Sequence, residues 1–553
     1  MEAAIYYHPE AYTTAGPKLM GRNAAGESFL RGFLQHSRAG QFWVQAETKP
    51  HAQHFAAAVR DAGRAEPVRA IIKGQQEGLA GLSQAGTVYM PGPGLAEPAW
   101  ARAGYGHAAW SLCGITHTTS SARAMDAIAG LLTAPVQPWD ALICTSRAVL
   151  KNVQTVLQAQ VDFLQARLGA QRLVLPQLPV IPLGIHTQDF VFSADQRSAA
   201  RAALQLPPNA VVVLFMGRLS FHAKAHPLAM YQALQMVAQE AGRPLVLIEC
   251  GWHANDYIAQ AYAAAAAHAC PDVKVHTLDG RLAQDRQTAW AAADVFCSLS
   301  DNIQETFGIT PIEAMAAGLP VVVSDWDGYK DTVRDGVDGF RIPTTMPPPG
   351  LAADLAARHA LEIDTYDMYC GHTCSLVAVD IPATAAALQR LVLSEELRRQ
   401  MGEQGRRRAV EAYDWKVVIG QYEALWARLA ELRAEGQQQP SRAAHPWPAR
   451  MDPFAAFAGY ATRTLTPQTQ LTLPPEGLQA AQARLAACRP LAMVDFARYV
   501  LPSQEELDQV LKGLASGPRP AGQLVKVVGQ ARQAAVFRAL AWLLKINVLR
   551  VVA

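Results

Sequence analysis

The sequence predicts an α/β protein with two successive domains, each built on a parallel sheet, and a small, mostly helical module at the C-terminal end. Three observations predict this architecture. Short apolar runs recur along the first 330 residues, as is typical of strands buried on both faces. Helical patterns lie between many of these runs, and such alternation favours a parallel sheet. After a Pro-rich stretch at 343–350, the readable patterns are mostly helical.

The bulk composition fits a compact enzyme. The chain has 553 residues, of which 50% are apolar and 17% charged, and its formal net charge is +2. At about 150 residues per domain, this length predicts three to four structural units. The near-neutral charge argues against nucleic acid as a partner, because nucleic-acid-binding domains are usually strongly basic.

The cysteines and the N-terminus bear on the compartment. Most of the eight cysteines lie inside apolar runs, so we expect buried free thiols. Cys370, His372 and Cys374 resemble half of a zinc site, but no second pair with zinc spacing accompanies them. No signal peptide and no run of about 18 apolar residues is visible. We expect a cytoplasmic protein, with peripheral contact at the inner membrane face left open.

The first domain is expected over residues 1–185. It opens with a strand at Ala3–Tyr7, then a loop that carries Gly16, Gly21 and Gly26, and then a helix at Glu27–His36. Further expected strands lie at 68–72, 87–90, 141–144 and 173–181, and expected helices at 122–132 and 147–168.

The second domain is expected over residues 186–435, after a crossover at 180–190. Its expected strands lie at 211–216, 244–249, 273–277, 295–299 and 319–324. Its expected helices lie at 227–241, 257–268, 285–293 and 311–317. A further helix is expected at 413–432, with the large apolar residues from Trp415 to Trp426 on one side.

The remainder of the chain is expected to form a linker and an accessory module. Residues 436–450 are rich in Gln and Pro and are typical of a linker. Residues 451–553 show helical patterns at 503–514 and 531–544 and a strand pattern at 547–552. Helices that close on a strand resemble a winged-helix module.

The most informative stretch runs from Glu305 to Ser324. A strand is expected to end near Ser300, and a loop with Glu305 and Gly308 leads into the next helix. Pro311 suits the first turn of that helix, where its missing N–H has no effect. The pattern therefore predicts a helix N-terminus at the carboxyl edge of a parallel sheet, which is where open α/β sheets bind ligands.

This loop and helix start suit a nucleotide with a diphosphate. The helix dipole and the free backbone amides would bind the diphosphate, and these amides belong to Phe307, Gly308, Ile309 and Thr310. A carboxylate in the first turn, Glu313, is poorly placed for phosphate and well placed to accept hydrogen bonds from ribose hydroxyls. Glu305, in the loop, is placed to do the same for sugar hydroxyls.

The spacing of these residues resembles a known family. Glu305, seven residues, Glu313 and then Ala-Met-Ala-Ala-Gly-Leu-Pro-Val-Val resemble the pattern of retaining GT-B glycosyltransferases of family 4, also called group 1. The resemblance covers roughly residues 1–435. It implies two Rossmann-like domains that face each other across a cleft. It also implies a nucleotide-diphosphate-sugar donor, an acceptor hydroxyl and retention of configuration.

Two further segments support the resemblance. Gly217-Arg218-Leu219, with Lys224 shortly after, resembles the element whose Arg and Lys hold the diphosphate, although the Arg–Lys separation is one residue longer than is common. Cations there would stabilise the charge that develops on the leaving group. Cys113-Gly-Ile-Thr-His117 resembles the strand end that presents a His to the donor sugar. The resemblance thus implies Glu305, His117, Arg218 and Lys224 as catalytic residues.

Two other features are interpreted through the same resemblance. The loop with Gly16, Gly21 and Gly26 matches the first glycine loop of the family in position, which implies contact with the acceptor or a phosphate. Asp325-Trp-Asp327 has the form of a metal-binding motif from the other glycosyltransferase fold. Because the GT-B pattern supplies cationic side chains instead, neither a metal nor another cofactor is expected.

Alternatives remain open at this stage. A GT-B nucleotide-sugar epimerase would carry the same donor residues. A non-catalytic nucleotide-sugar-binding or scaffold protein could use the terminal module to recruit a protein partner. The acceptor is a saccharide, a lipid-linked molecule or another hydroxyl compound, and the sequence does not choose among them.

Overall fold

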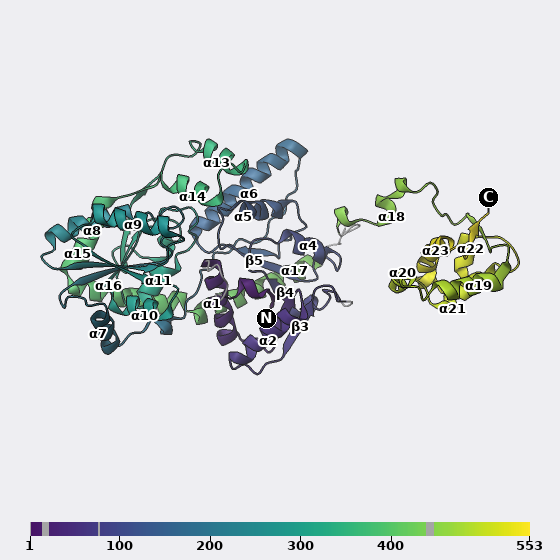
Figure 1. Cartoon of the computed structure of the whole chain (residues 1–553), viewed down its shortest axis with the longest axis horizontal. Coiled ribbons are helices and arrows are strands. Elements are labelled where there is room, and N and C mark those ends of the chain that lie inside the picture. The colour runs from purple at the N-terminus through teal and green to yellow at the C-terminus, as the bar shows by residue number, and fades with distance from the viewer. Residues whose placement is uncertain (1, 14–20, 76–77, 438–446, 553) are drawn as a thin grey trace. The chain divides into compact units, whose positions relative to one another are not determined.

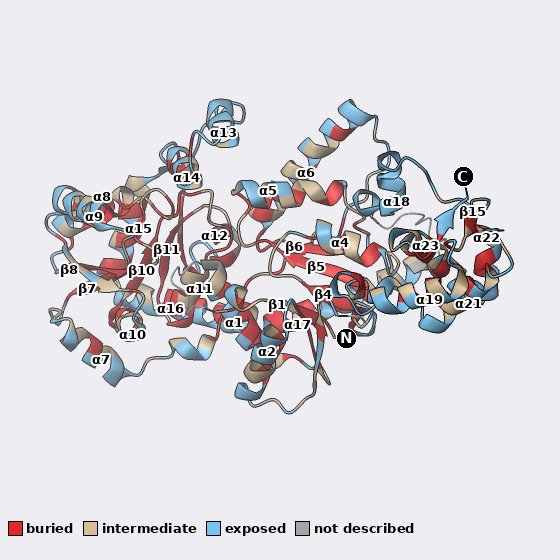
Figure 2. Ribbon diagram, turned by 45° about the vertical axis from the view of Figure 1, so that its right-hand side comes forward, coloured by how far each residue is buried: buried red, intermediate tan, exposed pale blue. Residues whose placement is uncertain are grey.

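The computed structural model describes residues 2–13, 21–75, 78–437 and 447–552. The chain divides into two compact units, Met1–Trp447 and Pro448–Ala553 (Figure 1). The larger unit holds two α/β domains, each with its own six-stranded sheet. The strands of both sheets are mostly buried, as the red ribbons of Figure 2 show.

The first sheet has the strand order β3-β2-β1-β4-β5-β6, and all neighbours are parallel. This is the Rossmann order. Its strands are β1 Ala4–Tyr7, β2 Phe42–Ala46, β3 Val68–Ile72, β4 Thr87–Tyr89, β5 Ser111–Ile115 and β6 Ala141–Ile143. Its helices are α1 Gly21–His36, α2 Lys49–Asp61, α3 Leu82–Ala85, α4 Ala96–Ala103, α5 Ala122–Ala129 and α6 Arg147–Leu168.

The second sheet repeats this topology, with the order β12-β11-β10-β7-β8-β9 and parallel neighbours throughout. Its strands are β7 Val211–Met216, β8 Leu245–Gly251, β9 Lys274–Asp279, β10 Val295–Ser298, β11 Val321–Ser324 and β12 Gly339–Ile342. Its helices include α7 Ala194–Ala203, α8 Leu228–Glu240, α9 Asp256–Ala269, α10 Ala283–Ala292, α11 Ile309–Ala316, α12 Tyr329–Thr332, α15 Ile381–Leu393 and α16 Glu395–Arg408. The two predicted Rossmann-like domains are confirmed. Residues of both domains line one cavity, so the domains face each other across a cleft.

Two predictions for the first domain are wrong. Residues 173–181 form only isolated bridges at Gln177 and Val180, because Pro176 and Pro179 remove backbone donors from that stretch. Gly21 and Gly26 lie in α1 and not in a loop, while Gly16 lies outside the described residues. A Cβ on Gly26 would lie 2.0 Å from the main-chain oxygen of Ala11, so this glycine allows close packing instead.

A helical excursion follows the second sheet. Strand β13 Thr344–Thr345 pairs with β14 Ala378–Val379, and α13 Ala353–Ala360 and α14 Tyr366–Cys374 lie between them in the sequence. This excursion was not predicted. It packs on the loop after β7, since a Cβ on Gly371 of α14 would lie 3.0 Å from the Cβ of His222.

The last helix of the larger unit, α17 Trp415–Gln437, returns to the first domain. Its Tyr422 ring centroid lies 5.4 Å from that of Phe29, and its Trp426 centroid lies 6.0 Å from that of Phe33. A Cβ on Gly32 of α1 would lie 2.4 Å from Cγ of Trp415, so the glycine is needed for this contact. The helix therefore completes the core of the domain with which the chain began.

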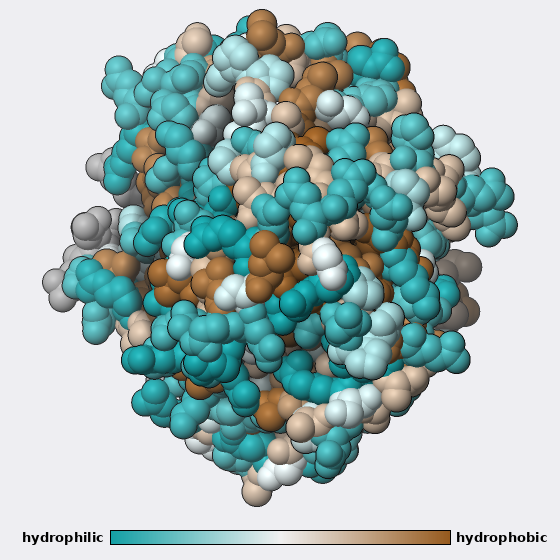
Figure 3. Space-filling view, turned by 90° about the vertical axis from the view of Figure 1, so that its left-hand side faces the viewer, coloured by the Kyte–Doolittle hydropathy of each residue, from teal (hydrophilic) through white to brown (hydrophobic). Residues whose placement is uncertain are grey.

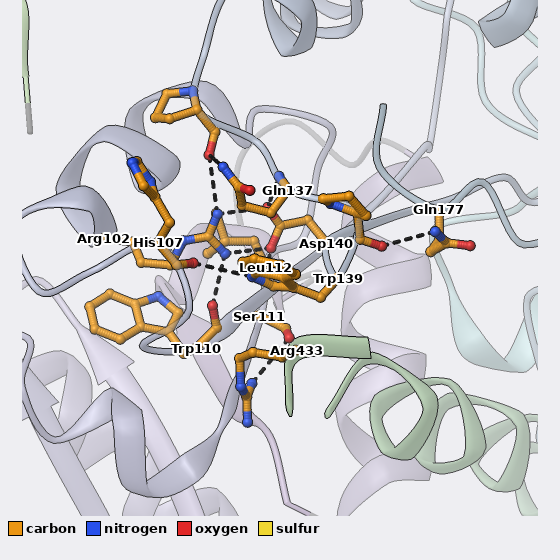
Figure 4. Close-up of polar contacts among 12 residues, drawn as sticks. Arg102, His107, Trp110, Ser111, Leu112, Gln137, Trp139, Asp140, Gln177 and Arg433 are labelled. Atoms are coloured by element: carbon orange, nitrogen blue, oxygen red, sulfur yellow. Dashed lines mark hydrogen bonds and ion pairs between the residues drawn. The ribbon is translucent and has the colours of Figure 1, made fainter. Parts of the chain in front are cut away.

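A buried ion pair fixes one part of the first domain (Figure 4). The side chains of Arg102 and Asp140 are both 0% exposed and make two N–H···O contacts of 2.5 and 2.7 Å. Arg102 also donates to the main-chain oxygen of Trp110 at 2.8 Å, and Asp140 accepts from the amides of Leu112 and Gln137, each at 2.8 Å. The two charges pair with each other, and the network joins α4, the start of β5 and the start of β6.

The smaller unit has its own core. Its three-stranded antiparallel sheet has the order β16-β15-β17, with β15 Gln470–Thr472, β16 Arg519–Pro520 and β17 Arg550–Val551. Its longer helices are α19 Gly477–Cys488, α21 Gln504–Gly513 and α23 Gln530–Lys545. This confirms the predicted helical module. Residues 448–553 contain twelve Lys and Arg against six Asp and Glu.

Among the described residues, no helix has both the length and the hydropathy that a membrane span requires. Figure 3 views the end of the larger unit that carries the second domain. Hydrophilic side chains cover most of this face, with apolar ones between them.

Candidate functional site

The candidate site lies where the second sheet changes direction. Strand β7 lies between β10 and β8, so the chain leaves β7 on one side of the sheet and later continues on the other. Open α/β sheets bind ligands at the carboxyl ends of such strands. The loop after β7 carries Arg218 and Lys224, and the loop after β10 carries Glu305. The structure thus brings together three of the four residues expected to be catalytic.

Lys224 and Glu305 form an ion pair. The Nζ atom of Lys224 lies 2.8 Å from Oε2 of Glu305, whose side chain is only 12% exposed. Burial by itself raises the pKa of Glu305. The ammonium of Lys224 and hydrogen bonds from the Thr306 and Phe307 amides outweigh burial, so the pKa lies below its ordinary value. Glu305 is therefore a carboxylate at neutral pH.

Arg218 is held against the same loop. Its Nη2 atom donates to Oε1 of Gln304 at 3.0 Å and to the main-chain oxygen of Ala223 at 3.2 Å. Gly217, which precedes it, has a φ of 150°, a conformation that favours glycine. The loop after β7 thus places a guanidinium against Gln304 and an ammonium against Glu305, its neighbour in the sequence.

The predicted helix start is present, and it depends on Gly308. This residue has a φ of 85°, and a Cβ there would lie 2.0 Å from Cε1 of Tyr329. It directly precedes α11, whose first residues are Ile309 and Thr310. The first amides of a helix have no intrahelical partner, so they suit an anion. The Phe307 side chain is buried, which leaves only its backbone for the donor.

Glu313 differs from Glu305 in its surroundings. It lies on α11 and is partly buried. Burial raises its pKa to about 7, and the Arg286 guanidinium opposes this shift. Within the described part of the chain, its carboxyl group has no hydrogen bond or ion pair. Its contact with ribose hydroxyls stays a prediction.

His117 follows β5 of the first domain and lies against the Glu305 loop. Its main-chain oxygen accepts a hydrogen bond from Oγ1 of Thr306 at 3.1 Å. Oγ1 of Thr145, after β6, donates to the main-chain oxygen of Thr306 at 3.4 Å. The two domains therefore meet at the residue next to Glu305.

Sequence reasoning missed Tyr366 and Gln304. The Tyr366 hydroxyl lies 2.8 Å from Oγ of Ser120 in the first domain, and Nε2 of Gln304 donates to it at 3.1 Å. Gln304 in turn accepts from Arg218, so α14 links the first domain to the cationic loop. No sequence pattern marks Tyr366, because it lies in the unpredicted excursion.

The two acidic residues Asp325 and Asp327 have separate partners. Asp325 lies 3.4 Å from the guanidinium of Arg341, and Asp327 accepts a hydrogen bond from Ser146 at 3.4 Å. Burial, with the nearby charge of Glu305, raises the pKa of Asp327 well above its ordinary value. Throughout the described ranges, no group of three or more His, Cys, Asp or Glu is placed to hold a metal ion.

Residues 210–358 match the family Glycosyl transferases group 1. The chain is 33% identical over 157 residues to a D-inositol 3-phosphate glycosyltransferase from Saccharomonospora viridis, covering 28% of this chain and 36% of that one. It is 32% identical over 146 residues to a phosphatidyl-myo-inositol mannosyltransferase from Mycobacterium leprae, covering 26% and 29%. The chain thus spans about a third of the length of the curated relatives it matches.

Solved structures give a weaker likeness. Anabaena Alr3699/HepE in complex with UDP has a TM-score of 0.47 at 16% identity, covering 77% of this chain and 100% of that one. Sucrose-phosphate synthase from Thermosynechococcus elongatus has a TM-score of 0.45 at 18% identity, covering 78% and 99%. These values identify no substrate. The family match includes Arg218, Lys224, Glu305 and Glu313 and confirms the resemblance of residues 210–358 to group 1 glycosyltransferases.

Proposed function

We propose that the protein transfers a sugar from a nucleotide-diphosphate-sugar to an acceptor hydroxyl with retention of configuration. The observation that carries this proposal is the Lys224–Glu305 ion pair of 2.8 Å, which lies beside Arg218 at the end of a group 1 glycosyltransferase sheet. Two cations at this place suit a diphosphate, and a carboxylate between the domains suits sugar hydroxyls.

The donor would lie along the second domain. Arg218, Lys224 and the amides of residues 307–310 hold the diphosphate, and Glu313 accepts hydrogen bonds from the ribose. Glu305 and His117 orient the sugar. Because Lys224 already contacts Glu305, the same ammonium would join the sugar-binding carboxylate to the leaving group.

The chemical step follows from this placement. The bond between the sugar C1 and the diphosphate oxygen breaks, and its electron pair goes to that oxygen. The acceptor oxygen forms a new bond to C1 on the same face, and its proton goes to the departing diphosphate. Arg218 and Lys224 stabilise the negative charge that develops. We propose that these cations provide the stabilisation without a metal or other cofactor.

The acceptor would bind on the first domain, next to His117. The relatives' names refer to inositol phosphate and phosphatidylinositol, but the match covers only 36% and 29% of those proteins. We therefore propose only a hydroxyl acceptor, either a saccharide, a lipid-linked molecule or another hydroxyl compound, and no nucleic acid.

A cytoplasmic location and a docking role for the smaller unit are part of the proposal. Residues Leu491–Val500 form a strongly exposed apolar segment in which Met493, Phe496 and Tyr499 are 86%, 89% and 85% exposed. Exposed clusters of this kind mark contact surfaces. A protein partner or a peripheral membrane contact would use this segment.

The first experiment is a thermal-shift screen of UDP, GDP and ADP and their common sugar conjugates, with magnesium and with EDTA. We expect one nucleotide to raise Tm equally in both conditions, and we expect transfer of its sugar to an acceptor panel. Glu305→Gln should still bind the nucleotide and lose transfer. Nucleotide binding without turnover on any acceptor would favour a non-catalytic scaffold protein. Release or isomerisation of the sugar without an acceptor would favour a nucleotide-sugar epimerase. If no nucleotide shifts Tm, the proposed donor site is contradicted.

A further inference from the structure

A cavity lined by basic side chains lies where the two Rossmann-like domains meet. The cavity has a volume of about 570 Å³. Its lining includes five basic side chains, which are Arg147, Lys330, Arg334, Arg341 and Arg408. Arg218, Lys224, Glu305 and Glu313 are not among its lining residues, so it shares only Phe307 with the proposed donor site. Its volume is in the range of small-molecule sites.

These cations gather in a unit that is not basic. Residues 1–447 contain 37 Lys and Arg against 41 Asp and Glu. The lining holds two carboxylates, Asp331 and Asp335, and each is already hydrogen-bonded to a backbone amide. Asp331 accepts from the Arg147 amide at 2.6 Å, and Asp335 accepts from the Arg341 amide at 2.9 Å. Asp331 also lies 3.7 Å from the Arg147 guanidinium, so the two carboxylates of the lining only partly balance its five cations.

Two of the cations are committed to the fold. Arg334 makes two contacts with Asp338, at 3.0 and 2.6 Å, and is held in place. Arg408 donates to the main-chain oxygens of Thr332 and Asp331, at 2.9 and 2.8 Å. Their charge contributes to the field in the cavity, but few of their donors are free.

The other three cations keep some donors free, although Arg341 lies 3.4 Å from Asp325 and donates to the main-chain oxygen of Lys330 at 2.9 Å. Lys330 is exposed, and its ammonium makes no hydrogen bond or ion pair with any described residue. Nε of Arg341 is buried without a hydrogen-bond partner. The Arg147 side chain is 84% exposed, and its guanidinium lies 3.7 Å from Asp331. A buried donor without a partner is costly, and an anion would satisfy it.

The exposed cations of the lining come from both domains. Arg147 is the first residue of α6 in the first domain, and Lys330 lies on α12 in the second. Phe307, Val333 and Tyr413 supply an apolar lining between the cations. We infer that this cavity binds a small molecule that bears a phosphate or diphosphate group, and that the bound anion links the two domains. Guanidinium and ammonium groups together are typical of phosphate sites.

The test uses the full chain with Arg218→Ala and Lys224→Ala, so that the donor site does not contribute, and inorganic pyrophosphate as the probe. We expect pyrophosphate to raise Tm and to titrate at one site in calorimetry. Adding either Arg147→Ala or Lys330→Ala should weaken the affinity of the protein for pyrophosphate about tenfold. This factor corresponds to about 1.4 kcal/mol, the loss of one charged contact. Lys151→Ala, on the exposed face of α6 outside the lining, is the matched control and should change nothing.

The bridging role needs its own measurement. If one anion contacts both cations, the combined Arg147→Ala and Lys330→Ala variant should lose less than the sum of the two single effects. Strictly additive losses would contradict a bridge. Unchanged affinity in both single variants, or no pyrophosphate binding at all, would overturn the site. A hexose phosphate and a short-chain phosphatidate, titrated in parallel, separate a soluble ligand from a lipid headgroup by which of them binds more tightly.

Discussion

The hydroxyl of Tyr366 accepts a hydrogen bond from Nε2 of Gln304 at 3.1 Å, although Tyr366 lies beyond the segment that matches the glycosyltransferase family. Gln304 uses its other side-chain atom to accept from Arg218 at 3.0 Å. Helix α14, which lies outside the matched segment, thus supports Arg218 through Gln304. Arg218 is one of the residues predicted to bind the diphosphate.

Tyr366→Phe should lower turnover more than it lowers stability. The change removes the hydroxyl that bridges Ser120 and Gln304, so Gln304, one of the two groups that hold Arg218, is less firmly placed. We expect kcat to fall about tenfold and the free energy of unfolding to fall by about 1 kcal/mol, the usual value of one hydrogen bond. Tyr369→Phe on the same helix is the control, since the Tyr369 ring stacks on His359 outside this network. Equal kinetics for both variants would remove Tyr366 from the site.

Lys224→Ala should damage both stability and catalysis. It leaves the Glu305 carboxylate, 12% exposed, without its cation, and an unpaired buried charge is costly. We expect kcat/KM for transfer to fall by about two to three orders of magnitude, as when a group that stabilises leaving-group charge is removed. Adding Glu305→Gln should restore much of the Tm without restoring activity. If the second change lowers Tm further, the ion pair is not what stabilises this loop.

The pKa of Glu313, about 7, predicts pH-dependent stability. Because the folded pKa lies above the ordinary value of 4.5, its contribution is fully present below pH 4.5 and is lost as the pH rises through 7. Glu313→Gln should therefore raise Tm relative to the parent at pH 8 and not at pH 5. Glu249 and Asp301, whose pKa values are also about 7, titrate in the same window, so the comparison with the parent isolates Glu313.

Donor binding should show the opposite pH trend. A ribose hydroxyl donates to a carboxylate, so nucleotide affinity should rise between pH 6 and pH 8 and this rise should be smaller in Glu313→Gln. Calorimetry in buffers of different ionisation enthalpy should detect proton release on binding to the parent near pH 7. An unchanged pH profile in Glu313→Gln would contradict the ribose contact.

Gly308→Ala should abolish nucleotide binding. The residue has a φ of 85°, and a Cβ would lie 2.0 Å from Tyr329, so α11 cannot start as it does. We expect the free energy of unfolding to fall by about 2 kcal/mol or more from strain and overpacking. Gly318→Ala is the matched control, because its φ is 77° but a Cβ there meets nothing within 4 Å. Strain alone should cost it about 1 kcal/mol and spare binding.

Arg102→Met should destabilise the first domain strongly. It leaves Asp140 charged at 0% exposure, and such a change usually costs about 3–5 kcal/mol. Denaturant unfolding followed by tryptophan fluorescence measures the loss. The double variant Arg102→Met/Asp140→Leu removes both charges, so part of the stability should return. A double variant no more stable than the single one would show that the backbone hydrogen bonds of Asp140 matter more than its charge.

The sequence predicts features formed by residues that are close in the chain, and it does not predict contacts between residues that are far apart in it. The loop and helix from Glu305 to Glu313 could be predicted because strand, glycine, helix start and helix end all lie within twenty residues. Strand β2 was missed because Gln45 interrupts its apolar residues, so that no clear apolar run is visible. The Lys224–Glu305 pair joins residues 81 positions apart, and the Tyr366–Ser120 contact joins residues 246 apart. Only the folded chain brings such groups together.

The return of α17 to the first domain affects how the chain is made. Phe29, Phe33 and Tyr89 emerge early from the ribosome, while the aromatic side chains that cover them, Tyr422 and Trp426, follow more than 300 residues later. Until then, the nascent first domain exposes an apolar face. Its synthesis therefore favours binding by chaperones, and a truncated chain that ends before Trp415 should be a substrate for proteolysis.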